Sequence, residues 1–166
     1  MCRLITSQIN TAPKPNGMRG SNRRKLTASE AAAIKAEAVE LHIPPEVLTF
    51  EEGMATGYMM DTGLVNVGGD VFPDTSSTLN RDRMSVKAVL AHEYYGHAAF
   101  PDSGYDTGHW ADEFRASYHA ALTAPGLSNE ERASLMVDAY DRAREAGVKV
   151  KFNKPYMRIV CGIGEG

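Results

Sequence analysis

Apolar residues recur at helical spacing in four segments of this chain, and capping residues mark where several of them begin. Thr27 and Glu30 form a capping box before the first segment, and Ser128 and Glu131 form another before the last. Ser85 is placed to cap the second segment. The pattern predicts about four helices, at residues 28–43, 86–97, 109–123 and 129–146.

Shorter runs with strand character lie between the first two predicted helices. Residues 58–60 and 64–67 flank an Asp-Thr-Gly turn, and residues 71–72 follow two glycines. These runs predict a small antiparallel sheet or hairpin directly before the second helix. Two C-terminal runs, 148–152 and 156–161, are also interpreted as strands, the first with the alternation of a half-exposed one.

Length and element content together predict one compact α+β domain over residues 27–166. The chain is 43% hydrophobic and 23% charged, which is ordinary for a globular protein. No stretch approaches the roughly 18 consecutive apolar residues of a membrane helix. The first residues turn polar too soon for a secretory signal. We therefore expect a cytoplasmic protein with no membrane partner, while export by another route stays open.

The two cysteines, Cys2 and Cys161, lie near opposite ends of the chain. Their spacing matches neither a metal site nor a disulfide framework. We expect free thiols, as in a reducing compartment.

Positive charge is concentrated at the N-terminus. Residues 1–29 carry six basic and no acidic residues, a charge of +6, whereas the remainder carries 12 basic and 21 acidic residues, a charge of −9. Because prolines and glycines interrupt this polar stretch, we expect residues 1–26 to form a flexible basic leader. Binding of nucleic acid by the leader is an alternative, although we expect no nucleic-acid partner.

The second predicted helix ends in the segment His92-Glu93-Tyr94-Tyr95-Gly96-His97, which has the residue types of a metal site. Two histidines can bind a divalent metal, and the glutamate between them can act as a general base. The histidines are five residues apart, about 500° around a regular helix, so they would point to different sides. The apolar stripe of the helix leads inward to this segment, where buried imidazoles and carboxylates need partners.

A π-type bulge resolves this geometry. One inserted residue rotates His97 back by about 100° to face His92, and such bulges are frequent at functional sites. Gly96, just before the second histidine, makes the distortion cheaper by its backbone freedom. We expect the helix to deviate near Gly96.

A catalytic zinc usually takes three protein ligands and leaves one position for water. Glu113 on the next predicted helix is our choice for the third ligand, and His109, four residues before it, is the rival. Glu113 and His109 can also act together, with one as the metal ligand and the other in contact with that ligand. Further candidates for a supporting or transition-state role are Asp112, Tyr95 and His119.

The segment from His92 to His97 resembles the His-Glu-x-x-Gly-His signature of the dipeptidyl peptidase III family of zinc peptidases. In that family both histidines bind zinc and the glutamate is the base. The family's second motif, Glu-Glu-x-Arg-Ala-Glu, supplies the third ligand from its second glutamate and is similar to residues 112–117, Asp-Glu-Phe-Arg-Ala-Ser. The aligned ligand is Glu113. Asp112 and Ser117 replace acids, and the chain is far too small to be that enzyme, so dipeptide release is not carried over.

A wider likeness joins the motif to its surroundings and looks like metallopeptidase domains of bacterial polymorphic toxins and mobile-element proteins. It implies a zinc-dependent hydrolase, with an effector role open, and says little about the substrate. The residues that carry it are Asn66 to Pro73, Asn80-Arg81, Ala91 to Glu93, Gly96-His97, Glu113, Ala116-Ser117 and Leu127 to Arg132.

These patterns together predict a zinc-dependent metallopeptidase that acts on a peptide or protein substrate. His92, His97 and Glu113 bind Zn²⁺, and Glu93 is general base and later acid. The alternatives are a non-catalytic protein stabilised by zinc and a nucleic-acid-associated protein that uses the basic leader.

Overall fold

The computed structural model describes residues 23–106 and 108–163. It contains the four expected helices, the second of which is divided into an α-helical and a π-helical part, together with short helices that the sequence pattern did not predict. The helices are α1 (Ala28–Glu40), η2 (Pro45–Val47), η3 (Gly69–Val71), α2 (Asn80–Arg83), α3 (Val86–Ala91), η4 (His92–His97), α4 (Trp110–Thr123), α5 (Asn129–Glu145) and α6 (Lys154–Cys161).

The sheet is small and mixed. Strands β2 (Gly57–Met59) and β3 (Leu64–Asn66) form the expected antiparallel hairpin. Strand β1 (Leu48–Thr49) adds to the other side of β3 in parallel, so the expectation of a purely antiparallel sheet is wrong in this respect. The order β1-β3-β2 leaves β2 at an edge, and this edge lies beside η4.

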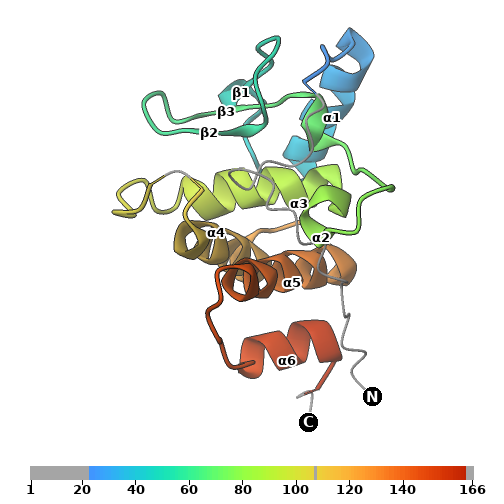
Figure 1. Cartoon of the computed structure of the whole chain (residues 1–166). Coiled ribbons are helices and arrows are strands. Elements are labelled where there is room, and N and C mark those ends of the chain that lie inside the picture. The colour runs from blue at the N-terminus through green and yellow to red at the C-terminus, as the bar shows by residue number, and fades with distance from the viewer. Residues whose placement is uncertain (1–22, 107, 164–166) are drawn as a thin grey trace.

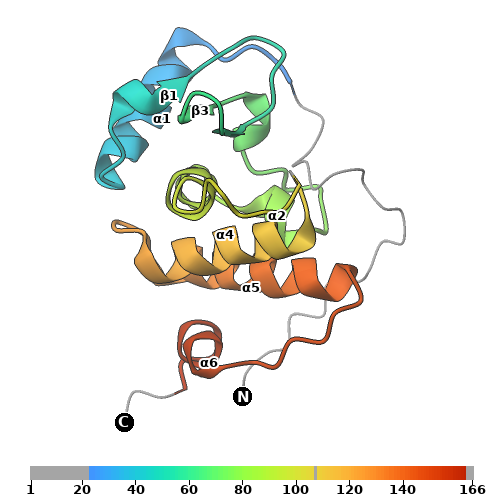
Figure 2. The same ribbon diagram turned by 90° about the vertical axis from the view of Figure 1, so that its left-hand side faces the viewer.

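The elements stack in layers around one core (Figure 1). The sheet and α1 lie on one side of α3, and α4 and α5 lie on its other side, with α6 beyond α5 (Figure 2). Buried apolar side chains from α1, β3, α3, α4 and α5 form one continuous cluster. These layers confirm the α+β fold class. In the described part of the chain no helix is long and apolar enough to cross a membrane.

Three expected strands are wrong. Residues 71 and 72 lie at the end of η3, and residues 148–152 form no strand. Residues 156–161 belong to α6, because Asn153 caps the helix, Pro155 lies in its first turn and Gly162 ends it in the left-handed conformation at φ 64°. Three aromatic rings in mutual contact then hold this helix against α5, those of Tyr140, Phe152 and Tyr156, of which Phe152 and Tyr156 are stacked.

Two further expectations concern the ends of the chain. The basic leader of residues 1–26 lies outside the described residues except for its last four. Cys161 is disulfide-bonded, so the expectation of a free thiol is wrong for this residue.

Buried polar side chains fix the loop that leads into β2. Asp70 accepts hydrogen bonds from the backbone N and the hydroxyl of Thr56, at 2.9 and 2.7 Å. Asn66 accepts from the backbone N of Glu51 and donates to the carbonyl of Ala55, both at 2.9 Å. Both Asp70 and Asn66 are almost fully buried. They hold the edge strand in place beside the helix that carries the histidines.

Candidate metal centre

The segment His92–His97 forms a π-helix that continues directly from α3. Both junction residues, Ala91 and His92, keep right-handed helical dihedrals, so the helix widens without breaking. The backbone N of Ala98 donates to the carbonyl of Glu93 at 3.2 Å, five residues earlier. The predicted deviation near Gly96 is confirmed.

Gly96 is required for a reason that the sequence pattern did not indicate. A Cβ atom at this position would lie 2.6 Å from the carbonyl oxygen of Ala116 and 2.8 Å from its Cα. The φ angle of Gly96 is not among the positive ones, so left-handed freedom is not what the position needs. The glycine instead lets η4 approach the backbone of α4, the helix that carries Glu113.

The wider turn brings three metal-binding atoms together. The Nε2 atoms of His92 and His97 are 3.1 Å apart. Glu113 places one carboxylate oxygen 3.3 Å from Nε2 of His92 and the other 3.5 Å from Nε2 of His97. Among the described residues, these three side chains form the group that could hold a metal ion.

The three separations fit a metal ion. With bonds of about 2.0–2.1 Å in a tetrahedral arrangement, two ligand atoms stand roughly 3.3 Å apart. His92 and Glu113 are buried and His97 is nearly so, so these polar atoms have little water to satisfy them. The residues present therefore fit a divalent cation.

The two histidines differ in their protonation. Burial lowers the pKa of His92, and the nearby carboxylate of Glu113 offsets this in part, so its ring is neutral as a ligand requires. Burial acts in the same direction on His97, but Asp112 and Glu113 outweigh it and raise its pKa to about 10. Nδ1 of His97 lies 3.2 Å from Asp112, whose other oxygen accepts from Arg115 at 2.6 Å. Asp112 therefore orients His97 from behind.

Glu113 projects from the first turn of α4 and is paired with Arg142 from α5 at 3.1 Å. Burial alone would raise the pKa of Glu113, but its contacts with His92 and His97 and the charge of Arg142 hold it well below its usual value. The carboxylate is thus ionised and ready to bind a cation.

Behind His92 lies a buried network that the sequence analysis missed. Nδ1 of His92 is 2.7 Å from the hydroxyl of Ser117, which donates to Asp138 at 2.6 Å. Asp138 in turn accepts from Arg142 at 3.2 Å. A signal was available, because Asp138 and Arg142 stand four residues apart on the apolar face of the last long helix.

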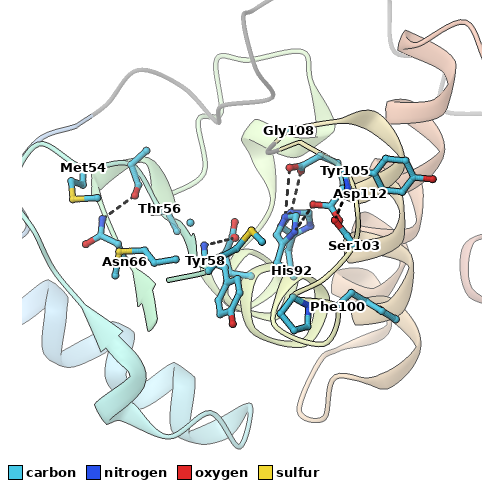
Figure 3. Close-up of a pocket in the computed structure, with 18 of the residues that line it drawn as sticks. Met54, Thr56, Tyr58, Asn66, His92, Phe100, Ser103, Tyr105, Gly108 and Asp112 are labelled. Atoms are coloured by element: carbon cyan, nitrogen blue, oxygen red, sulfur yellow. Dashed lines mark hydrogen bonds and ion pairs between the residues drawn. The ribbon is translucent and has the colours of Figure 1, made fainter. Parts of the chain in front are cut away.

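Glu93 faces a cavity of about 490 Å³ that opens between the sheet and the loop before α4. Its carboxylate accepts a hydrogen bond at 3.0 Å from the backbone N of Tyr58 in β2. The three ligand side chains line the same cavity, and Figure 3 shows Met54 and Thr56 toward one end, Asp112 toward the other, and Tyr58 and His92 between them. The candidate base and the ligand group therefore share one accessible space.

The other candidates are not brought into this group. His109 is exposed at the start of α4, where its ring stacks on Tyr105 with centroids 4.7 Å apart. The hydroxyl of Tyr95 donates to the carbonyl of Leu41 at 2.7 Å. His119 binds the carbonyl of Tyr95 at 2.8 Å and so supports the π-helix. These three side chains have structural contacts that occupy them.

Comparison of the chain with protein-family models, with curated proteins and with solved structures finds no match. The resemblance to zinc peptidases therefore stays a prediction from the motifs.

Replacing Gly96 with alanine tests the close approach of the two helices. We expect Gly96→Ala to lower the free energy of unfolding by about 1–3 kcal/mol, because the added methyl group meets the backbone of Ala116. We also expect zinc affinity to fall on the order of tenfold, because η4 is displaced from Glu113. Urea denaturation and competition with a chelator measure the two effects. Gly57→Ala is the control, since its added methyl group meets nothing within 4 Å; equal effects of both changes would contradict the argument.

The raised pKa of His97 predicts that metal binding releases a proton. With a pKa of about 10, the His97 ring is protonated at neutral pH in the metal-free protein, and a metal needs its bare nitrogen. Affinity should therefore rise about tenfold per pH unit and level off above the pKa of His97. Calorimetry in buffers with different heats of ionisation should detect about one proton per ion at pH 7. Binding without proton release would show that His97 is not a ligand or is already neutral.

Proposed function

We propose that this protein is a zinc-dependent metallopeptidase that hydrolyses peptide bonds. The observation that carries the proposal is the convergence of His92, His97 and Glu113, at separations that suit one ion, in a cavity that also holds the carboxylate of Glu93. Three protein ligands beside an open space are typical of a catalytic metal, whereas a structural zinc site has four.

The residues of the site have complementary roles in this proposal. His92, His97 and Glu113 would hold a divalent cation, which would supply Lewis-acid polarisation of water and of the scissile carbonyl. Glu93 accepts the proton of the attacking water and later donates it to the leaving nitrogen. The hydrogen bond from Tyr58 keeps its carboxylate pointed into the cavity. Asp112 keeps Nε2 of His97 directed at the ligand group.

Zinc is favoured among divalent ions by the ligand types. Two imidazoles and one carboxylate suit zinc, whereas magnesium and calcium prefer oxygen ligands alone. The alternative is a structural zinc site, which requires four protein ligands. The group found among the described residues has three members, which favours a catalytic site.

A peptide substrate is supported by the position of β2. This strand is at the edge of the sheet, and its three residues line the cavity. The backbone N of Tyr58 points toward Glu93 and away from β3. An extended peptide can lie along such an edge by strand addition, next to the N–H of Tyr58 that Glu93 already accepts.

The mouth of the cavity adds an apolar component. Met54, Met60 and Tyr105 line it and are 40%, 61% and 47% exposed. Exposed apolar side chains at a cavity mouth suit apolar side chains of a bound chain. An effector role and a cytoplasmic location stay predictions from the sequence.

Glu93→Gln tests the assignment of the general base. We expect this change to retain zinc and to lower peptide hydrolysis by about 10²–10⁴-fold, because the amide cannot accept the proton of water. The amide oxygen can still accept from Tyr58, so the local structure is preserved. Zinc content and the cleavage of a peptide library by the purified, zinc-loaded protein are the measurements.

Glu52→Gln is the matched control, because Glu52 is exposed, pairs with Lys25 and does not line the cavity. It should leave both zinc content and hydrolysis unchanged. If the wild-type protein binds zinc but hydrolyses no peptide, the non-catalytic alternative is favoured. If Glu93→Gln cleaves peptides as fast as the wild-type protein, Glu93 is not the general base.

A further inference from the structure

We propose that Ser117, Asp138 and Arg142 are positioning residues, which hold two of the metal ligands from behind and set the metal affinity of the site. This inference rests on the proposed metal site and adds a buried ring to it. The ring runs from His92 through Ser117, Asp138 and Arg142 to Glu113.

The ring follows from the packing of α4 against α5. Glu113 and Ser117 are one helical turn apart on α4, and Asp138 and Arg142 are one turn apart on α5. Ser117 contacts Asp138, and Glu113 contacts Arg142. The two helices therefore run in opposite directions, and two polar residue pairs connect them, Ser117 with Asp138 (the first rung) and Glu113 with Arg142 (the second rung). These pairs contact η4 at His92 and His97.

The first rung, Ser117 with Asp138, determines which ring nitrogen of His92 carries no proton. Asp138 is ionised, because Arg142 and Arg81 outweigh the effect of burial and hold its pKa below the usual value. An ionised carboxylate only accepts, so the single hydroxyl proton of Ser117 points to Asp138. The oxygen of Ser117 must then accept from His92, which places the ring proton on Nδ1. Nε2, the atom 3.3 Å from Glu113, is left with a free lone pair.

The second rung fixes the third ligand. Arg142 binds Asp138 through Nε and Glu113 through Nη1, so one planar guanidinium holds both carboxylates. Its contact is with Oε2 of Glu113, the oxygen that also lies nearest to His92. The guanidinium therefore restricts rotation of the ligand carboxylate.

The polar side chains of this ring are buried in the core, where polar groups are not solvated by water. Ser117 and Asp138 are fully buried, and Arg142 is 4% exposed. The neighbours on the same face of α5 are Leu135, Ala139 and Ala143, all buried and apolar. Buried charges are costly to the fold unless they are paired, and partners of metal ligands are a known use for them.

The experiment measures zinc affinity by competition with a chelator in three single variants of the full chain. Ser117→Ala removes the group that His92 contacts and leaves no charge unpaired. Asp138→Asn keeps the shape but removes the charge. We expect each to weaken zinc binding about 10–100-fold. Asp141→Asn is the matched control: Asp141 is on the same helix but pairs with Arg144, so affinity should be unchanged.

Two further measurements distinguish a role of Ser117 and Asp138 in positioning the metal ligands from a role in fold stability alone. The visible spectrum of the cobalt-loaded protein reports the geometry around the metal, and it should change in Ser117→Ala and Asp138→Asn but not in Asp141→Asn. Losses in the double variant Ser117→Ala, Asp138→Asn should be smaller than the sum of the two single losses, because Asp138 acts on His92 through Ser117. Thermal melting identifies the variants that are folded at the assay temperature.

The results that overturn the inference differ from those that overturn the proposed function. If wild-type protein binds no zinc, the proposed function is wrong. If wild-type protein binds zinc and folded Ser117→Ala has the same affinity and cobalt spectrum, the ring does not position the ligands, and the metallopeptidase proposal stands without it. Should Asp138→Asn not fold, Ser117→Ala alone decides the question.

Discussion

The contact between Gly96 and Ala116 is the constraint on which the rest of the site depends. A side chain at position 96 would collide with the backbone of α4, so only glycine allows η4 to lie this close. The π-helical turn then directs His97 to the same side as His92, and the short distance to α4 brings Glu113 within 3.5 Å of both rings. The inserted residue and the missing side chain act together: one sets the direction of the imidazoles and the other sets their distance from the carboxylate.

Much of this arrangement could be predicted from the sequence, because local signals determine it. The capping residues Thr27, Ser85 and Ser128 all cap the helices that they mark. The five-residue spacing of the histidines is incompatible with a regular helix, so it predicted the π-helix. The residues that contact η4 could not be predicted, since Ala116 and Ser117 reach it only through the packing of α4. For the network behind them, the spacing of Asp138 and Arg142 on α5 was the one available signal. The reason for Gly96 was likewise hidden, because a close approach depends on the other helix.

The departures of this chain from the dipeptidyl peptidase III motif have a physical interpretation. Ser117 stands where the motif has an acid, and in this structure its hydroxyl leads to the carboxylate of Asp138. Asp138 on α5 thus contacts His92 through Ser117. Asp112 keeps the acidic character of its position and pairs with His97. Each histidine therefore has an oxygen partner behind it, which is the usual condition for an imidazole that binds metal.

Electrostatics in the metal-free protein prepare the site for a cation. Glu93, Asp112 and Glu113 gather within one cavity, while the positive charges of Arg115 and Arg142 face Asp112 and Glu113 from outside the ligand group. In the metal-free state His97 carries a proton that a cation would replace.

The most direct measurement is the zinc content of purified protein, compared with that of His97→Ala and Glu113→Ala. We expect one zinc ion per wild-type chain and a large loss in both variants. A wild-type protein without zinc, or variants that retain it fully, would show that these residues do not form a metal site.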